Sequence, residues 1–208
     1  MPDLPSIYLI TDRKQIPQDK HFLRVLEELL AAGVGMLQLR EKDLSAAELL
    51  PLALQVRRLT NKYSCRMLIN DRIDVALAVD ADGVHLGGHS LPPTIARMLI
   101  GPDKLIGAST HNIDEVFAAT DQGADFVTFG PVFHTPSKAA YGEPVGLEKL
   151  QQACHQKTIP IYGLGGIKPE NTPDVKQAGA DGIAMISGLL CADSPSSSYH
   201  QFLKNFDF

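Results

Sequence analysis

Short apolar runs rich in β-branched and aromatic residues recur eight times along the chain. They lie at residues 7–11, 35–40, 66–70, 83–87, 105–109, 126–130, 159–165 and 182–187. Segments with helix-compatible amphipathic spacing follow them at residues 22–33, 45–62, 73–81, 92–101, 112–124, 147–156, 170–180 and 197–206. Strands that alternate with helices predict a parallel sheet with right-handed crossovers. Eight such units in 208 residues favour a single-domain TIM (β/α)8 barrel over residues 1–208, rather than an open doubly wound sheet.

Connections between the predicted helices and strands repeat one pattern. The phrases "AAGVGMLQL", "VDADGVHLG", "DQGADFVTFG" and "KQAGADGIAMI" each end a helix with small residues and glycine before a strand begins. Glycine is the common C-cap of such a turn. The one long connection, residues 131–146, exceeds an ordinary βα loop and is a candidate lid or ligand loop.

In the stretch "MLQLREKD", polar and apolar residues alternate with a period of two. Gln38, Arg40 and Lys42 share one side of the predicted second strand, and Leu37 and Leu39 share the other. In a closed barrel the polar side faces the interior and the mouth, whereas the leucines pack against the helices. The stripe therefore predicts an anion site at the carboxyl end of the barrel, where TIM-barrel active sites form.

Composition narrows the classes of partner. The net charge of −5 and the isoelectric point near 5.8 give no basic surface for nucleic acid, so any anion must be bound locally. Cys65, Cys154 and Cys191 are odd in number and lack metal-ligand spacing, which fits a reducing compartment. With no targeting segment and no membrane-length apolar run, we expect a cytoplasmic protein without membrane contact. The sequence does not decide whether it forms a homo-oligomer.

Glycine-rich motifs follow the last two predicted strands. "GLGGI" at 163–167 and "MISG" at 185–188 suit a phosphate platform in which backbone N–H groups approach an anion. The candidate donors are Gly165, Gly166, Ile186 and Ser187. Tight turn geometry alone would also explain the glycines.

The long loop carries Thr135, Ser137 and Lys138. Two hydroxyls and an ammonium group could wrap a second, more highly charged phosphate group, and loop closure would exclude water. A solvated "TPSK" turn is the alternative.

Asp71 follows the third predicted strand, where a carboxylate could hold Mg²⁺ beside a phosphate. Capping of the helix that starts at Ile73 is the competing interpretation, and local sequence slightly favours it.

Histidines and one serine complete the candidates. His85 lies inside an apolar run and is predicted to be a satisfied core histidine. His111 and His134 are better placed to meet a ligand as acid–base groups, although no orienting carboxylate is visible in the sequence. Ser109 ends the fifth strand and is expected to hydrogen-bond a ligand, since no G-x-S-x-G elbow makes it a nucleophile.

The motifs "YLITD", "QLREK", "LINDR", "DGVHLG", "GASTH", "FGPVFHTPSK", "GLGGI" and "ADGIAMISG" occur in this order between residue 7 and about residue 188. Together they resemble the thiamine phosphate synthase superfamily, which includes the TenI thiazole tautomerases. The resemblance implies a TIM barrel that binds small phosphorylated thiamine precursors. It also implies a synthase reaction that joins thiazole phosphate to hydroxymethylpyrimidine diphosphate and releases pyrophosphate.

The resemblance also implies roles for individual residues. Pyrophosphate would be held by Gln38, Arg40, Lys42, Asn70 and Lys138. Asp71 would bind Mg²⁺ and Ser109 would contact the pyrimidine. Thr135 and Ser137 would bind the thiazole phosphate or brace the loop, and Gly166, Ile186 and Ser187 would donate backbone N–H groups to it.

Two positions depart from the family patterns. Synthases usually follow "HLG" with Gln, an acidic residue and Asp, and the last is a second magnesium ligand; here Gly88, His89 and Ser90 stand in those places. Tautomerases resemble "FGHVF" with a proton-transferring histidine, whereas this chain has Pro131 there and a histidine only at 134. The main hypothesis is a transferase, thiamine phosphate synthase. A TenI-like isomerase using His134 or His111 and a non-catalytic binding protein for thiazole phosphate or thiamine phosphate are the alternatives.

Overall fold

Eight parallel strands close into a barrel in the computed structural model, which describes residues 3–135 and 143–207. The strands are β1 (Ile7–Ile10), β2 (Met36–Leu39), β3 (Arg66–Asn70), β4 (Gly83–Leu86), β5 (Leu105–Thr110), β6 (Phe126–Phe129), β7 (Ile161–Leu164) and β8 (Gly182–Met185). Each strand pairs with the next, and β8 pairs with β1. The predicted TIM barrel and all eight predicted strands are confirmed.

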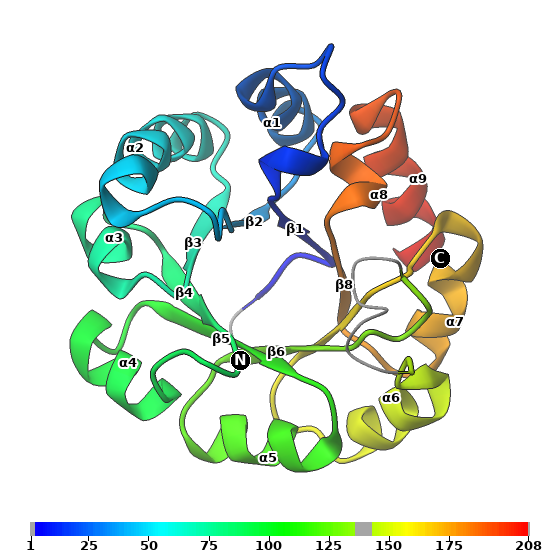
Figure 1. The fold of residues 1–208 in the computed structure, drawn as a ribbon. Coiled ribbons are helices and arrows are strands. Elements are labelled where there is room, and N and C mark those ends of the chain that lie inside the picture. The colour runs from blue at the N-terminus through cyan, green and yellow to red at the C-terminus, as the bar shows by residue number, and fades with distance from the viewer. Residues whose placement is uncertain (1–2, 136–142, 208) are drawn as a thin grey trace.

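Helices form a ring around the barrel (Figure 1). They are α1 (Phe22–Ala31), α2 (Ala46–Lys62), α3 (Ile73–Ala78), α4 (Pro93–Ile100), α5 (Ile113–Asp121), α6 (Gly146–His155), α7 (Thr172–Gln177), α8 (Ser187–Leu190) and α9 (Pro195–Asp207). Two 3-10 turns, Arg13–Gln15 and Pro169–Asn171, precede α1 and α7. The hydrophobic pattern predicts neither α8 nor the first of these turns, because segments of three or four residues are too short to show helical periodicity.

The predicted alternation is confirmed within β2 for Leu37, Gln38 and Leu39, whereas Arg40 and Lys42 lie beyond the end of the strand. Leu37 and Leu39 belong to the large core between barrel and helices, and both are fully buried. Met36 belongs to the smaller core inside the barrel. Gln38 is two residues further on, and its side chain contacts Tyr8, another member of that inner core. The strand ends at Leu39, so Arg40 begins the loop at the mouth.

Inside the barrel, aromatic side chains pack against glycines on neighbouring strands. A Cβ on Gly107 would lie 2.5 Å from Phe126 Cζ and 2.6 Å from His85 Nδ1. A Cβ on Gly182 would lie 2.3 Å from Tyr162 Cε1. These glycines therefore make the room that aromatic side chains occupy, and any larger residue would displace a ring.

Three aspartates repeat one contact at the opposite, amino end of the strands. Asp82, Asp125 and Asp181 directly precede β4, β6 and β8. Each accepts a backbone N–H at 2.7–2.8 Å from the preceding strand, the donors being Met67, Ile106 and Ile161. Each also pairs with a cation at 2.6–2.7 Å, namely Arg57, Arg97 and Lys157. The aspartates of the repeated "DG" and "ADF" sequences thus connect neighbouring strands by hydrogen bonds.

We expect Asp125→Ala to lower the free energy of unfolding by about 1–2 kcal/mol, because a charged acceptor is lost from a backbone N–H and a partly exposed ion pair is broken. Catalytic parameters should not change, since Asp125 is at the end of the barrel away from the mouth. Denaturant unfolding measures the first effect and steady-state kinetics the second. Asp121→Ala, at an exposed position at the end of α5, is the control and should change neither.

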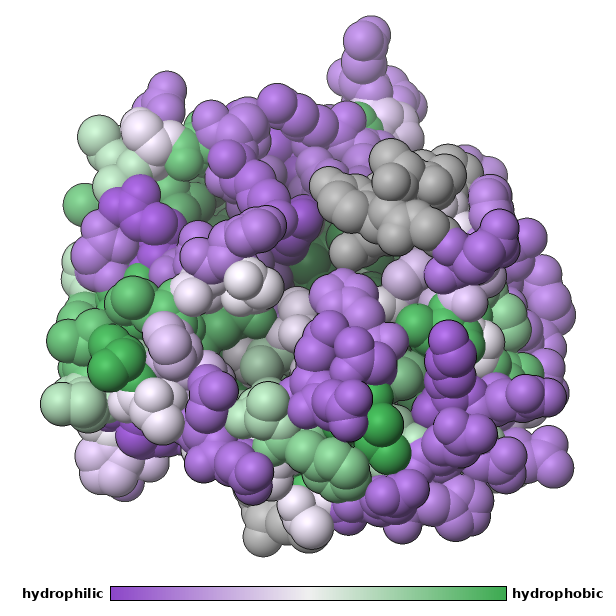
Figure 2. Space-filling model, turned by 60° about the horizontal axis from the view of Figure 1, so that its bottom comes forward, coloured by the Kyte–Doolittle hydropathy of each residue, from purple (hydrophilic) through white to green (hydrophobic). Residues whose placement is uncertain are grey.

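Large hydrophobic side chains are exposed mainly around α3 and α4. They include Leu77, Leu91, Ile95, Met98 and Leu99. Figure 2 shows hydrophobic residues gathered at the left of its view, the side on which Figure 1 draws these two helices. Within residues 3–135 and 143–207, no helix has both the length and the apolar character needed to cross a bilayer.

Candidate active site

A cavity of about 320 Å³ opens where β7 and β8 end. Its lining includes the predicted residues His134, Thr135, Gly165, Gly166, Ile186 and Ser187. The structure therefore brings together the candidates from the sixth, seventh and eighth strand ends. Gln15 and Lys168 also line this cavity, although neither belongs to a motif that predicts a site. Lys168 directly follows "GLGGI", and this position next to a predicted phosphate motif is the feature of the sequence that could have identified it.

The glycine turn after β7 is held in a conformation that favours glycine. Gly165 and Gly166 have φ angles of 99° and 65°. A Cβ on Gly166 would lie 2.6 Å from the backbone oxygen of His134. Among the described residues, no hydrogen bond uses the N–H of Gly166, nor that of Ser187, which begins α8 and has no acceptor within it. Two backbone donors are thus available to an anion.

A second group of predicted residues surrounds His85 on the other side of the barrel. Gln38 Nε2 donates to the Tyr8 hydroxyl at 3.0 Å, and that hydroxyl lies 3.3 Å from His85 Nδ1. His85 Nε2 lies 3.0 Å from the Ser109 hydroxyl oxygen. Burial, together with the nearby charge of Arg40, lowers the pKa of His85 to about 3, so the imidazole is neutral. The predicted core role of His85 is confirmed, and the ring also contacts a candidate ligand residue.

Arg40 and Asn70 lie half-buried near this group. Asn70 is the register partner of His85, and the Arg40 charge acts on the same imidazole. Neither side chain hydrogen-bonds another residue within the described ranges, so both are available to a ligand. Lys42 lies two residues beyond Arg40 and is exposed.

Glu41, between two predicted anion-binding residues, is a buried carboxylate that sequence reasoning does not identify. Its side chain is 1% exposed. It accepts hydrogen bonds from the Thr11 hydroxyl at 2.6 Å, from the Arg13 backbone at 3.0 Å and from the Arg13 guanidinium at 3.1 Å. The Thr11 oxygen in turn accepts the Arg40 N–H at 2.9 Å. Glu41 therefore joins the loop after β1 to the loop after β2 and fixes the backbone of Arg40.

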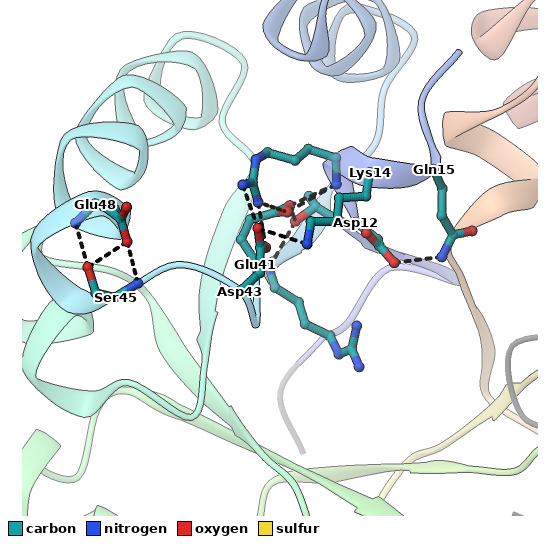
Figure 3. Close-up of polar contacts among 10 residues, drawn as sticks. Asp12, Lys14, Gln15, Glu41, Asp43, Ser45 and Glu48 are labelled. Carbon is teal, nitrogen blue, oxygen red and sulfur yellow. Dashed lines mark hydrogen bonds and ion pairs between the residues drawn. The ribbon is translucent and has the colours of Figure 1, made fainter. Parts of the chain in front are cut away.

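The outer part of this contact is an ion-pair cluster at the edge of the mouth (Figure 3). Arg13 binds Asp43 through two nitrogen–oxygen contacts of 2.7 Å, and Lys14 adds a third contact at 3.1 Å. The hydrogen bond from Arg13 holds the pKa of Asp43 well below its usual range. The carboxylates thereby neutralise Arg13 and Lys14.

Asp71 is not a helix cap, and that interpretation was wrong. The N-cap of α3 is Arg72, and no side chain caps the helix. Asp71 instead has a φ of 62°, and its backbone N–H donates to the His85 oxygen at 2.9 Å. The turn projects an exposed carboxylate that accepts no hydrogen bond from the described residues. It is free to meet a cation.

Ser90, which replaces the family's second carboxylate, has a structural partner. Its hydroxyl oxygen accepts the Gly87 N–H at 2.7 Å and so closes the turn after β4. Throughout residues 3–135 and 143–207, no three His, Cys, Asp or Glu side chains form a cluster suited to a metal. A single carboxylate such as Asp71 suits Mg²⁺ in sites where phosphate and water supply most of the other ligands.

The two candidate acid–base histidines, His111 and His134, differ in their location and contacts. His111 does have a carboxylate partner, contrary to the sequence expectation: its Nδ1 lies 2.9 Å from Glu115, which also takes part in capping α5 through Asn112. This pairing places His111 in a helix cap rather than in the cavity. His134 is exposed and lines the cavity. Ser137 and Lys138 lie outside the described residues.

A closed eight-stranded barrel with a glycine-lined cavity and polar strand ends at one mouth defines the class of TIM-barrel proteins that act at the carboxyl ends of their strands. The chain belongs to the thiamine monophosphate synthase family, whose model matches residues 7–189.

Relatives and a solved structure agree with this assignment. A protein of Geobacter sulfurreducens named "Putative thiamine-phosphate synthase" is 53% identical over 190 residues, which are 91% of this chain and 89% of the relative. The thiamine-phosphate synthase of Clostridium acetobutylicum is 41% identical over 90% of this chain and 88% of its own. The solved thiamine phosphate pyrophosphorylase of Pyrococcus furiosus superposes with a TM-score of 0.87, at 34% identity, over 97% of this chain and 95% of its own. The predicted family is confirmed, and the transferase is supported over the tautomerase.

Proposed function

We propose that this chain condenses hydroxymethylpyrimidine diphosphate with thiazole phosphate to give thiamine phosphate and pyrophosphate. The observation that supports the proposal is that one barrel mouth carries two separate sets of groups suited to binding anions. Backbone N–H groups lie in the cavity beside β7 and β8, and Arg40 and Asn70 lie beside His85. Two sets suit a reaction whose two substrates each carry phosphate. The three free cysteines fit a reducing compartment, and we place the reaction in the cytoplasm.

Each set is assigned to one substrate. Pyrophosphate would be bound by Arg40, Lys42 and Asn70, with Gln38 below them and Lys138 from the long loop. The thiazole phosphate would be bound in the cavity by Gly166, Ile186, Ser187 and Thr135, together with Ser137. Lys168 lines the same cavity and adds a positive charge near that phosphate. Ser109 would contact the pyrimidine.

The reaction needs charge stabilisation rather than a protein nucleophile. The bond between the pyrimidine methylene carbon and the diphosphate oxygen breaks, and the electron pair leaves with pyrophosphate. Arg40 and its neighbours stabilise the departing charge, which lowers the barrier to a pyrimidine methylene cation. The lone pair of the thiazole nitrogen then forms the new carbon–nitrogen bond.

Asp71 would hold Mg²⁺ together with oxygens of the diphosphate. Bound there, the ion would neutralise charge on the leaving group. The exposed carboxylate next to the end of β4 fits this role, and water or pyrophosphate oxygens can occupy the positions that a second carboxylate would fill.

We expect Ser90→Asp to lower the Mg²⁺ concentration needed for half-maximal activity by about tenfold, because it restores the second carboxylate that the synthases usually carry at this position. Asp71→Asn should raise that concentration by a similar factor. Titration of activity with Mg²⁺ at saturating substrates measures both effects. Asp74→Asn, a nearby surface change on α3, is the control. Equal Mg²⁺ dependence in the wild type and the three variants would contradict the assignment of Asp71 as a Mg²⁺ ligand.

Gly166→Ala should raise the KM for thiazole phosphate at least about tenfold, because the new Cβ would collide with the His134 oxygen at a φ that alanine rarely adopts. The KM for the diphosphate substrate should change less. Gly88→Ala provides the matched control, since a Cβ there meets no atom within 4 Å. A selective rise in the KM for the diphosphate instead would place the two phosphates the other way round.

One preparation can separate the proposed function from its alternatives. The purified protein is incubated with Mg²⁺ and both substrates, then with each substrate omitted, and separately with the thiazole carboxylate phosphate tautomer. Synthesis predicts pyrophosphate release that requires both substrates. Isomerisation without pyrophosphate release would identify a tautomerase. Thermal stabilisation by thiazole phosphate without either reaction would identify a binding protein.

A further inference from the structure

A line of hydrogen bonds crosses the barrel interior from β2 to β5 through four side chains. Its members are Gln38, Tyr8, His85 and Ser109. Gln38, Tyr8 and His85 are at most 2% exposed, whereas Ser109 is half-buried at the mouth. The line thus runs from a sealed interior to the edge of the site.

The direction of each hydrogen bond follows from counting protons. The Gln38 amide is oriented with Nε2 toward Tyr8; in that orientation Nε2 donates and the Tyr8 oxygen accepts. Within the described residues, His85 Nδ1 is the remaining acceptor for the Tyr8 proton. If Nδ1 carried a proton instead, the fully buried Tyr8 hydroxyl would have no partner for its own, which is costly. Nδ1 is therefore the acceptor.

We propose that Tyr8 and His85 fix the hydrogen-bond polarity of Ser109. The His85 proton is on Nε2 and is donated to the Ser109 oxygen, so the serine hydroxyl donates to an acceptor atom of the bound ligand. Tyr8 and His85 are positioning residues, since they act on the ligand through Ser109.

Two further observations support this arrangement. Burial raises the pKa of Tyr8 and lowers that of His85, so the phenol keeps its proton and the imidazole carries one. Gly107 leaves the space beside the ring, since a Cβ there would lie 2.6 Å from Nδ1. Glycine at this position therefore permits the ring to lie where Nδ1 meets the Tyr8 hydroxyl.

The consequence for the ligand rests on the proposed function. An aminopyrimidine offers acceptors at its ring nitrogens and donors at its amino group. A serine hydroxyl whose oxygen already accepts from His85 offers its proton to a ring nitrogen. The pyrimidine would therefore be oriented with a ring nitrogen, rather than its amino group, toward Ser109.

The test uses the wild-type protein labelled with ¹⁵N at histidine and long-range ¹H–¹⁵N correlation spectra without substrate. The His85 resonances are those that do not titrate between pH 5 and 8 and that disappear in His85→Gln. We expect a neutral ring protonated on Nε2. A ring protonated on Nδ1 would overturn the proposal, whether or not the protein proves to be a synthase.

Two tyrosine variants test the positioning role. Tyr8→Phe removes the donor to Nδ1, so the Nδ1 shift should move away from its unprotonated value. The KM for hydroxymethylpyrimidine diphosphate should rise about five- to tenfold, roughly the effect of one hydrogen bond. Tyr162→Phe is the matched control, because it removes a buried hydroxyl of the same inner core that donates to the Pro5 oxygen instead. An unchanged His85 spectrum in Tyr8→Phe, or the same shift in Tyr162→Phe, would contradict the assigned role.

Discussion

Arg40→Ala should lower kcat/KM for the pyrophosphate-releasing reaction by about 100-fold or more. Removal of one group that stabilises developing charge has an effect of this size in other enzymes. The free energy of unfolding should change by less than about 1 kcal/mol, because the half-buried side chain hydrogen-bonds no described residue. Steady-state kinetics and denaturant unfolding of the same preparation give the two numbers.

Two other variants sharpen this prediction. Arg40→Lys keeps the charge but loses the planar pair of donors, so its activity should lie between the wild type and alanine. Arg58→Ala removes an equal charge from the exposed face of α2 and should leave kcat/KM unchanged. Parallel losses of stability and activity in Arg40→Ala would show that the arginine supports the fold rather than the reaction.

Glu41→Ala should have the largest effect on stability of the changes considered, a loss of about 3 kcal/mol in the free energy of unfolding. It leaves the Thr11 hydroxyl and the Arg13 backbone N–H without their buried acceptor, and it breaks a partly buried ion pair. Activity per folded molecule should fall about tenfold or more, because Thr11, which accepts the Arg40 N–H, is no longer held in place by Glu41. Chemical unfolding and kinetics at a temperature where the variant is folded measure both.

The control is Glu48→Ala, which removes an exposed carboxylate from the capping box of α2. Its cost should be about 1 kcal/mol, without loss of activity. Thr11→Val should reproduce the kinetic part of the Glu41→Ala effect, since it removes the oxygen that accepts the Arg40 N–H. Full activity in Thr11→Val would contradict the proposed link between Glu41 and Arg40.

Much of the fold could be predicted because periodicity is a local property. Strand-length apolar runs followed by amphipathic segments indicate a parallel barrel, and the alternation at Gln38 and Leu39 indicates which side faces inward. The glycine cavity was also predictable, since Gly166 and Ser187 follow the two strands that commonly form phosphate sites in this fold.

Other features depend on contacts between residues far apart in the sequence. Glu41 is buried because Thr11 and Arg13 surround it from the loop after β1, a pairing that periodicity does not indicate. The sequence predicts a helix cap at Asp71 because caps are common, yet its backbone is left-handed and its side chain does not cap α3. The hydrogen bonds from Gln38 to Ser109 join four different strands, so only the register of the closed barrel reveals them.

The most direct test of the central claim is the stoichiometry of a single-turnover reaction. Excess purified protein is mixed with hydroxymethylpyrimidine diphosphate, thiazole phosphate and Mg²⁺, and pyrophosphate and thiamine phosphate are quantified over time. We predict that both products appear at the same rate and in equal amounts. Failure to form thiamine phosphate at high protein concentration, with both substrates intact, would contradict the account.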